Sequence, residues 1–238
     1  ITCYTFSIFY HFFLKNLIVC FFSSLYYHHM AKKIKAVIFY FGNVISVTNT
    51  GDCANEMEKL TGVPAKVFRR AYEDFRFDFD RGLISGAQMY AKTLEKYGYN
   101  EVAQNISLMK KIARLDLESW KEYRQDVTDW GLLLQKQGYK IGILSNMPYE
   151  FLDLYEKHIP LFVASDCNVF SCRVHHIKPE PQIYYKILEG LTVLPEEAVF
   201  FDDLEENIQQ ANKIGIKGLL WKSLQQAQND FEKMIQNQ

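Results

Sequence analysis

Five short apolar runs, with helical patterns between the later ones, constrain the fold more than any other feature of this chain. Most of the runs lack alternation of polar and apolar residues, which is typical of strands covered on both faces. Strand–helix alternation implies right-handed crossovers and a parallel sheet. The predicted strands are Ala36–Phe41, Lys140–Ser145, Leu161–Ser165, Ala198–Asp202 and Lys217–Trp221.

Helical patterns occupy the connections of the predicted sheet. Gly138 and Gly215 stand where two helices are expected to end, because glycine readily adopts the left-handed conformation found there. Pro179 is expected at the start of another helix, where a missing N–H costs nothing. The predicted helices are Asp126–Gln137, Tyr149–His158, Glu180–Glu189 and Glu205–Ile214.

A long stretch after the first predicted strand interrupts this alternation. It contains several helical patterns and no convincing strand, and its run Phe75–Gly82 is both aromatic and charged. One interpretation packs the Phe side chains of this run on neighbouring helices, and another brings Arg76 or Arg81 to the mouth of an active site. The expected organisation is a core domain over residues 30–50 and 124–238 with a helical insertion over 51–123.

The first 29 residues differ in composition from the rest of the chain. They are mostly Phe, Tyr, Ile, Leu and Ser, with Lys15 as their only Lys or Arg, and Met30 then opens the core domain. One interpretation is translated upstream sequence, with Met30 as the true start. A membrane anchor is the second, although His11 and Asn16 interrupt the apolar run, and a secretory signal is the third. We leave residues 1–29 out of the fold prediction.

The overall composition argues against several classes of protein. The 238 residues are 48% hydrophobic, with a formal net charge of -1, and no basic run favours nucleic acid as a partner. Five cysteines, an odd count without a Cys-x-x-Cys pair, argue against a disulfide framework or a zinc site. We expect buried or idle thiols in a cytoplasmic protein whose residues 30–238 do not enter a membrane.

Polar residues gather at or after the carboxyl ends of the predicted strands. Ligands of parallel sheets bind beyond these ends, so residues far apart in the sequence are expected to converge there. That convergence makes the set more informative than any of its members. The set comprises Tyr40, Gly42, Ser145, Asn146, Lys178, Asp202 and Asp203.

Each of these residue types suits one part of a phosphate or metal site. Two adjacent carboxylates, Asp202 and Asp203, can hold a magnesium ion, which prefers hard oxygen ligands. The Ser145 hydroxyl, with backbone N–H groups beside it, can bind a phosphate oxygen, and it can equally cap the helix that follows. Lys178 can neutralise the charges of phosphate and carboxylate together.

Four pieces of the chain, in this order and spacing, resemble the four motifs of the haloacid dehalogenase (HAD) superfamily. The resemblance covers roughly residues 34–221, and the first motif is similar to that of a phosphatase branch that normally has Asp-x-Gly-Asn. It implies a Rossmann-like, doubly wound α/β fold with strand order 5-4-1-2-3 and a small all-helical cap after strand one. The four pieces are Tyr40-Phe-Gly-Asn43, Leu144-Ser-Asn146, Ile177-Lys-Pro179 and Phe200-Phe-Asp-Asp203.

The resemblance also implies a magnesium cofactor. Asp202 is expected to bind the metal directly, with Asp203 in support and Asn207 bracing the loop. Gly42 takes the position of the general acid, which is often already glycine in this branch, and its backbone oxygen remains an expected metal ligand.

The implied activity is hydrolysis of small, sugar phosphate-like monoesters. Ser145, Asn146 and Lys178 are the expected phosphate ligands, and Lys178 is also an expected catalytic residue. The expected partner is a small phosphorylated metabolite, and the chain is expected to be a monomer or a homodimer. Dehalogenation of a small haloacid is the enzymatic alternative.

Tyr40 departs from the family pattern, because the family has an aspartate here that attacks the substrate and binds the metal. A phenol with a reference pKa near 10 is neutral at pH 7, and its ring would occupy the phosphate space. We therefore expect an impaired copy of a phosphatase. A recent mutation or sequence error, a pseudoenzyme that binds without catalysis, and an unusual active form are the open interpretations.

Overall fold

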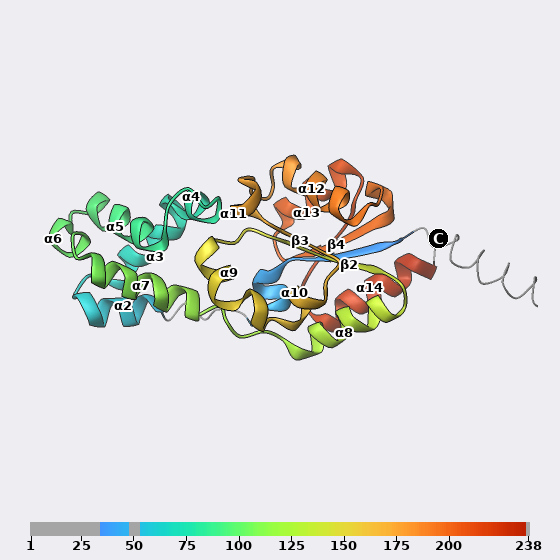
Figure 1. The fold of residues 1–238 in the computed structure, drawn as a ribbon, viewed down its shortest axis with the longest axis horizontal. Helices are drawn as coiled ribbons and strands as arrows, with labels where there is room; N and C mark the ends of the chain where they lie inside the picture. The colour runs from blue at the N-terminus through green and yellow to red at the C-terminus, as the bar shows by residue number, and fades with distance from the viewer. Residues whose placement is uncertain (1–33, 48–52, 237–238) are drawn as a thin grey trace, which may run out of the picture. The chain divides into compact units, whose positions relative to one another are not determined.

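A five-stranded parallel sheet with β1 at its centre forms the core (Figure 1). The computed structural model describes residues 34–47 and 53–236, so the predictions for residues 1–29 lie outside the described residues. The order β3-β2-β1-β4-β5 is the predicted order 5-4-1-2-3 counted from the other edge, and it confirms the doubly wound fold. The strands are β1 (Ala36–Phe39), β2 (Lys140–Ser145), β3 (Cys167–Phe170), β4 (Ala198–Asp202) and β5 (Lys217–Leu220).

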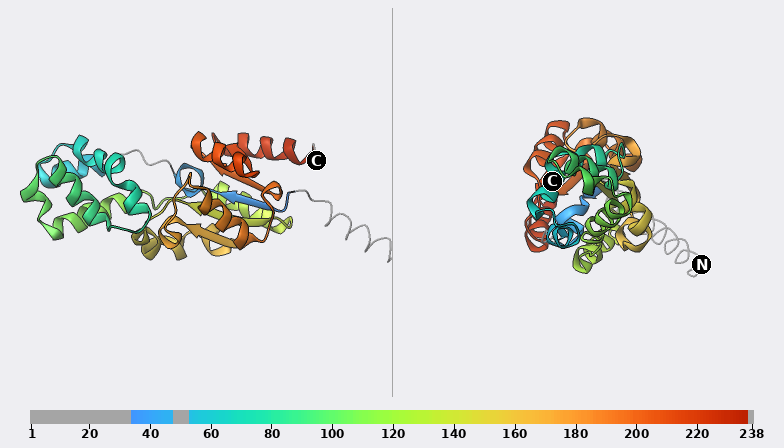
Figure 2. Two further views of the ribbon diagram at one scale, coloured as in Figure 1. Left: turned by 90° about the horizontal axis from the view of Figure 1, so that it is seen from above. Right: turned by 90° about the vertical axis from the view of Figure 1, so that its left-hand side faces the viewer.

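Helices cover both faces of the sheet (Figures 1 and 2). Ile187 of α12 packs in one hydrophobic cluster with Phe200 of β4. On the other face, Trp130 of α8 lies edge-on to Phe39 and Phe201, with ring centroids 5.5 and 5.4 Å apart. Burial of both faces explains why the strands are continuously apolar. The core helices are α8 (Gln125–Lys136), α9 (Tyr149–Tyr155), α10 (Pro160–Ala164), α11 (Ser171–Val174), α12 (Pro181–Leu191), α13 (Glu205–Ile214) and α14 (Leu224–Gln236).

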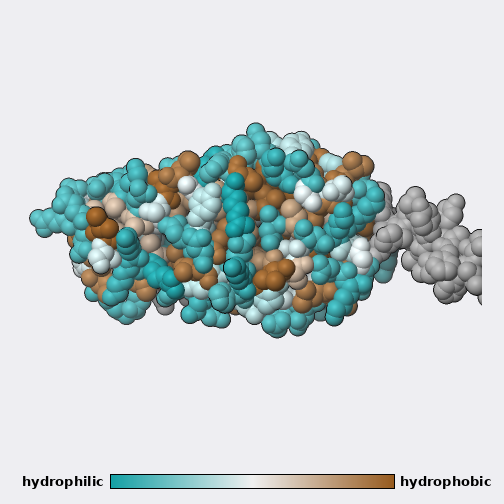
Figure 3. Space-filling model, viewed as in Figure 1, coloured by the Kyte–Doolittle hydropathy of each residue, from teal (hydrophilic) through white to brown (hydrophobic). Residues whose placement is uncertain are grey.

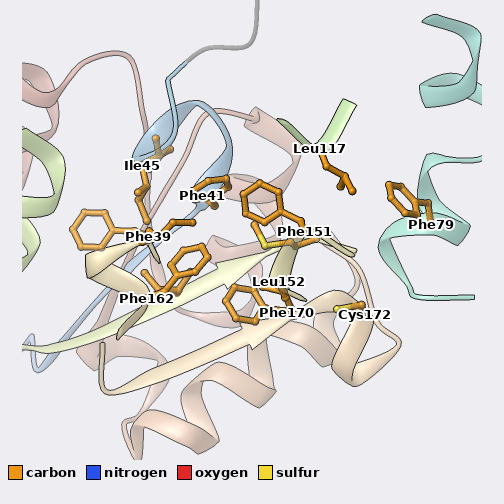
Figure 4. Close-up of a cluster of buried hydrophobic side chains, with 14 of the residues drawn as sticks. Phe39, Phe41, Ile45, Phe79, Leu117, Phe151, Leu152, Phe162, Phe170 and Cys172 are labelled. Carbon is orange, nitrogen blue, oxygen red and sulfur yellow. The ribbon is translucent and has the colours of Figure 1, made fainter. Parts of the chain in front are cut away.

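An aromatic cluster fixes the chain where it leaves β1 (Figure 4). The ring centroid of Phe41 lies 5.2 Å from that of Phe151 and 5.2 Å from that of Phe162. Phe41 begins a short π-helical turn, Phe41–Ile45, in which Asn43 has a φ of 57°. Asparagine adopts this left-handed conformation more readily than most residues. The packing of Phe41 therefore positions its neighbour Tyr40 and the turn behind it.

A helical cap lies between β1 and β2, as expected from the sequence. In the described part of this connection the structure has helices and no named strand. The chain leaves and re-enters the core at neighbouring points, because Ser46 forms an isolated β-bridge with Tyr123. The cap helices are α2 (Cys53–Thr61), α3 (Ala65–Asp74), α4 (Arg76–Asp80), α5 (Gly86–Lys96), α6 (Asn100–Ala103) and α7 (Ile106–Glu118).

Two predictions of secondary structure are wrong. The apolar run Leu161–Ser165 lies largely in helix α10, and β3 follows it. A run of this length cannot be assigned by periodicity alone, and Pro160 at the first helical position favours a helix. Pro179 does not begin α12 but follows a cis peptide bond, and Pro181 occupies the first turn.

Residues Ile34–Gln238 form one compact unit. On the face shown in Figure 3, hydrophilic residues predominate and apolar ones are scattered among them. Within the described ranges, no helix is both long enough and apolar enough to span a bilayer.

Candidate functional site

The carboxyl ends of β1, β2 and β4 bring the predicted site residues to one edge of the sheet. Phe39 of β1 pairs with Phe201 of β4, so Tyr40 and Asp202, each one residue further along, stand at the same level. The Tyr40 backbone N–H donates to the Phe201 carbonyl at 2.9 Å. Ser145 ends β2, the neighbour of β1 on its other side.

Lys178 connects the tyrosine and the aspartate. Its Nζ lies 2.5 Å from Asp202 Oδ2 and 3.3 Å from the centroid of the Tyr40 ring. The side chains of Lys178 and Asp202 are 1% and 0% exposed, so the ion pair is shielded from water. Burial lowers the pKa of the Lys178 ammonium group, and Asp202 opposes that change. The aromatic face supplies the cation with a second favourable contact.

The two aspartates after β4 have different partners. Asp202 Oδ1 accepts hydrogen bonds from the Leu204 backbone N–H and from Asn207 Nδ2, both at 2.9 Å. Asp203 Oδ2 accepts from Asn43 Nδ2 at 2.7 Å, while its Oδ1 is buried without a hydrogen-bond partner among the described residues. Burial raises the pKa of Asp203, and the bond from Asn43 opposes that rise.

The Tyr40 ring folds back over Gly42. A Cβ atom at Gly42 would lie only 2.5 Å from the Tyr40 hydroxyl, so the phenol fills the space that a side chain at position 42 would need. Burial raises the pKa of the phenol, and the nearby Asp202 and Asp203 raise it further. Tyr40 therefore remains neutral at physiological pH and provides no anionic oxygen at this position.

Ser145 and Asn146 lie in the wall of a pocket but already have partners in the protein. The buried Ser145 hydroxyl donates to the Asn146 carbonyl at 3.3 Å. The Asn146 side chain donates to the Lys178 carbonyl at 3.1 Å and accepts from the Lys178 backbone N–H at 2.7 Å. Asn146 thus fixes the loop that carries Lys178, and one N–H of its side-chain amide is used for that contact.

A pocket of about 310 Å³ extends from this site to the cap. Tyr40 and Gly42 line its core end, and Arg76 lines its cap end, in agreement with one interpretation of the run Phe75–Gly82. Arg81 is not part of this wall; it pairs with Glu180. The remaining lining residues are Phe41, Tyr72, Phe77, Asp80, Asp116, Leu117, Trp120, Ser145, Asn146, Met147, Phe151 and Leu204.

The cap end of the pocket holds a charged cluster that sequence reasoning only partly found. Arg76 Nε donates to both carboxylate oxygens of Asp80, at 2.8 and 2.9 Å, and Arg76 Nη1 lies 4.0 Å from Asp116 Oδ2. The spacing of Arg76 and Asp80 on one helix could have indicated the first pair. Asp116 comes from a different helix, α7, so no local pattern could have indicated it.

The side chains present form an incomplete set of magnesium ligands. Both oxygens of Asp202 already have partners, and Tyr40 supplies a neutral phenol, which is not the anionic oxygen ligand that magnesium prefers. Near the ends of β1 and β4, Asp203 Oδ1 is buried and has no hydrogen-bond partner among the described residues. Within the described ranges, no group of three or more His, Cys, Asp or Glu side chains is arranged to hold a metal ion. The chain with Tyr40 therefore does not fit a resident magnesium ion.

Curated relatives match only a part of their own length. Mouse bifunctional epoxide hydrolase 2 is 32% identical over 155 residues, which are 63% of this chain and 27% of that protein. The chain spans 20% to 27% of the length of the rat, mouse and pig epoxide hydrolases that it matches. Pyrophosphatase PpaX from Bacillus mycoides is 28% identical over 125 residues, which are 52% of this chain and 58% of that protein.

Solved structures agree with the fold, and a family model identifies the family. A HAD family enzyme from Bacteroides thetaiotaomicron, solved with magnesium and inorganic phosphate, has a TM-score of 0.62 and 20% identity, with 80% of this chain and 96% of that chain covered. The model of the haloacid dehalogenase-like hydrolases matches residues 90–220, more than half of the chain, in a stretch that does not include Tyr40. The chain belongs to the haloacid dehalogenase-like hydrolase family.

Proposed function

We propose that this chain has the scaffold of a magnesium-dependent phosphatase for small, sugar phosphate-like monoesters, and that Tyr40 impairs its turnover. The observation that carries the proposal is the contact of Lys178 Nζ with the Tyr40 ring at 3.3 Å. A lysine at this edge of the sheet would neutralise a bound phosphate in the transition state. In this chain an aromatic side chain covers that lysine.

The chemistry of Tyr40 also argues for impaired turnover. A phosphatase of this family needs a carboxylate at position 40 to attack phosphorus. The Tyr40 phenol is neutral, and its hydroxyl has no hydrogen bond to a base among the described residues. Loss of a nucleophile costs several orders of magnitude in rate. A residual activity of the chain is therefore expected to be small.

The other candidate residues support descent from a working enzyme. Ser145, Lys178 and Asp202 remain fully or almost fully buried at the strand ends, and Asp203 follows them. A site that had long lost its function should have lost more of these polar groups, because buried polar side chains without a role are costly. Codons for Asp and Tyr can differ by one base, so a recent change at Tyr40 is consistent with this pattern. We propose a cytoplasmic phosphorylated metabolite as the original substrate.

The substitution Tyr40→Asp tests this proposal in the full-length chain. It returns a carboxylate beside Asp202 and removes the ring from Lys178. We expect phosphatase activity on a panel of sugar phosphates to rise by at least about 10³-fold and to depend on added magnesium. Tyr40→Asn is the matched control, because asparagine has the same shape as aspartate but no carboxylate that could attack phosphorus. This variant should stay inactive.

Two further variants define the site of the restored activity. Asp202→Asn and Lys178→Ala, each combined with Tyr40→Asp, should abolish most of the gain. Equal activity of the unmodified chain and of Tyr40→Asp would contradict the proposal, since the tyrosine or another residue would then be the nucleophile. Release of halide from chloroacetate, without release of phosphate from any ester, would indicate a dehalogenase lineage.

A non-catalytic binding role is the second candidate, because the pocket of about 310 Å³ persists beside Tyr40. This role predicts that a phosphorylated compound raises the melting temperature of the unmodified chain without being hydrolysed. It also predicts that Tyr40→Asp gains no activity on any ester. Hydrolysis by Tyr40→Asp would contradict it as an account of the lineage.

A further inference from the structure

The cap end of the pocket has more negative than positive charge. One guanidinium group, Arg76, lies between two carboxylates, Asp80 and Asp116, whose side chains are 6% and 2% exposed. Burial raises the pKa of both carboxyl groups, and Arg76 opposes the rise in each case. Each carboxylate is thus already disfavoured in its ionised form by its surroundings. A further anion brought into this end of the pocket would add to that penalty.

Arg76 is the member of this cluster that a ligand can reach. Its side chain is 19% exposed, clearly more than either carboxylate. Its hydrogen bonds all run from Nε to Asp80, and its guanidinium carbon lies 4.6 Å from the centroid of the Tyr72 ring. Neither terminal nitrogen has a hydrogen-bond partner among the described residues. The guanidinium group is held by Asp80 and Tyr72, and Nη1 lies 4.0 Å from Asp116 Oδ2, too far for a hydrogen bond. The Nη edge can therefore still donate to a ligand in the pocket.

Asp116 is held in place by Tyr72, the residue whose ring also contacts Arg76. Its Oδ1 accepts a hydrogen bond from the Tyr72 hydroxyl, which in turn accepts one from Trp120 Nε1 at 3.2 Å. The chain of contacts leaves Asp116 little freedom to turn away from an incoming group. Its charge therefore acts on the pocket from a fixed position.

The rest of the wall near this cluster is largely apolar. Phe77 and Leu204 line the pocket with exposures of 63% and 47%, and Leu117 and Trp120 line it as well. An apolar wall does not compensate an added negative charge. It does accept the carbon skeleton of a small ligand.

We propose that Arg76, Asp80 and Asp116 select phosphomonoesters whose leaving group is neutral and bears a hydroxyl or carbonyl oxygen, and that they reject leaving groups with a carboxylate or a second phosphate. This selection rests on the proposed function, because it assumes that the phosphate lies at the core end. The Nη edge of Arg76 donates to the neutral oxygen. The two carboxylates repel an anionic tail, which separates this pocket from one suited to pyrophosphate.

The test uses binding and does not require turnover. In full-length Tyr40→Asn, with magnesium present, the affinities of glycerol 3-phosphate and 3-phosphoglycerate are measured by isothermal titration calorimetry. The two esters have the same three-carbon skeleton and differ by a carboxylate. We expect glycerol 3-phosphate to bind at least about tenfold more tightly, the order expected for one uncompensated charge contact in a partly shielded pocket.

Added substitutions in the cap assign the preference to this cluster. Asp116→Asn removes one charge with little change in shape and should narrow or reverse the preference for the neutral ester. Asp80→Asn should also narrow the preference for the neutral ester. This variant replaces Asp116→Asn in the test if Asp116→Asn does not fold. Arg76→Met should weaken binding of glycerol 3-phosphate, because it removes the donor that holds the neutral oxygen.

Three results would overturn the inference: equal or tighter binding of 3-phosphoglycerate, an unchanged preference in both aspartate variants, or binding of neither ester. Its failure can be told apart from failure of the proposed function. Charge selection in Tyr40→Asn without any turnover by Tyr40→Asp would refute the phosphatase lineage and keep the inference. Turnover by Tyr40→Asp without charge selection in Tyr40→Asn would support the phosphatase lineage and refute the inference.

Discussion

The two ends of the pocket have the same kinds of charged groups, but they differ in whether the positively charged side chain can still reach a ligand. Each end combines one buried or half-buried cation with two carboxylates. At the core end the Tyr40 ring lies 3.3 Å from Lys178 Nζ, whereas at the cap end the Nη nitrogens of Arg76 keep an open edge. At the core end the groups are Lys178, Asp202 and Asp203, which lie beside Tyr40 and do not line the pocket themselves. At the cap end they are Arg76, Asp80 and Asp116, which do line it.

Under the proposed function, this difference means that the cap end can still bind a ligand, whereas the core end can no longer carry out the reaction. The cap end keeps a donor for a ligand, and the core end has its cation covered by a side chain of the protein itself. One residue, Tyr40, accounts for the contrast, because it supplies both the ring over Lys178 and the missing carboxylate. The comparison can be tested by removing either cation or by changing the charge at the cap end alone.

Removal of each cation is expected to give the largest difference in stability. Lys178→Met leaves Asp202 fully buried without its ion-pair partner, and loss of one member of such a pair costs about 3–5 kcal/mol. Arg76→Met should cost less, because the Arg76 side chain is 19% exposed and its pair with Asp80 is less completely shielded from water than the pair of Lys178 with Asp202. Urea denaturation at pH 7 measures both free energies of unfolding.

A larger loss of stability for Arg76→Met than for Lys178→Met would contradict the contrast between the two ends of the pocket. If Arg76→Met were the more destabilising of the two variants, the cap cluster would be the tighter structural element. The Nη edge of Arg76 would then be part of a closed network and no longer available for a ligand.

A smaller effect is expected from the charge of Asp116. Burial raises its pKa in the folded state above the unfolded value, so its ionised form disfavours folding. That penalty is absent below the unfolded pKa, near pH 4, and grows as the pH rises through the folded pKa. Asp116→Asn should therefore raise the free energy of unfolding at pH 8 by roughly 1 kcal/mol, a typical scale for one substitution.

The same variant should have little effect on the free energy of unfolding near pH 3, below the reference pKa of about 3.9, where Asp116 is largely protonated in both states. Urea titrations at the two pH values supply the comparison. A loss of stability of Asp116→Asn at pH 8 would mean that the Asp116 charge is needed to hold Arg76. The charged groups at both ends of the pocket would then be structural ion pairs, and the contrast between the ends would be lost.

The central strands of the sheet were predictable because they are buried on both faces and therefore read as continuous apolar runs. β2 and β4 have the predicted bounds, Lys140–Ser145 and Ala198–Asp202, since each is a continuous apolar run closed by a turn. The run Leu161–Ser165 was not assigned correctly, because a short apolar stretch suits a buried helix equally well. Its position after Pro160 decided the outcome in favour of a helix.

The candidate site was predictable where the order of the strands brings residues together, and not where a contact depends on a loop conformation or on helix packing. Tyr40 follows β1 and Asp202 ends the adjacent strand β4, so their convergence follows from the sheet. The contact of Asn43 with Asp203 joins residues 160 positions apart and depends on the left-handed turn at Asn43. Asp116 reaches Arg76 only through the packing of two cap helices, for which the sequence has no spacing rule.

Titration of inorganic phosphate into the full-length chain tests most directly whether Tyr40 occupies the anion position. With magnesium present, calorimetry should detect no binding by the unmodified chain. Tyr40→Asn, which uncovers Lys178 without adding a nucleophile, should bind phosphate with a dissociation constant tighter than about 1 mM. Equal binding by the two proteins would contradict the account, because the ring could not then be what keeps the anion from Lys178.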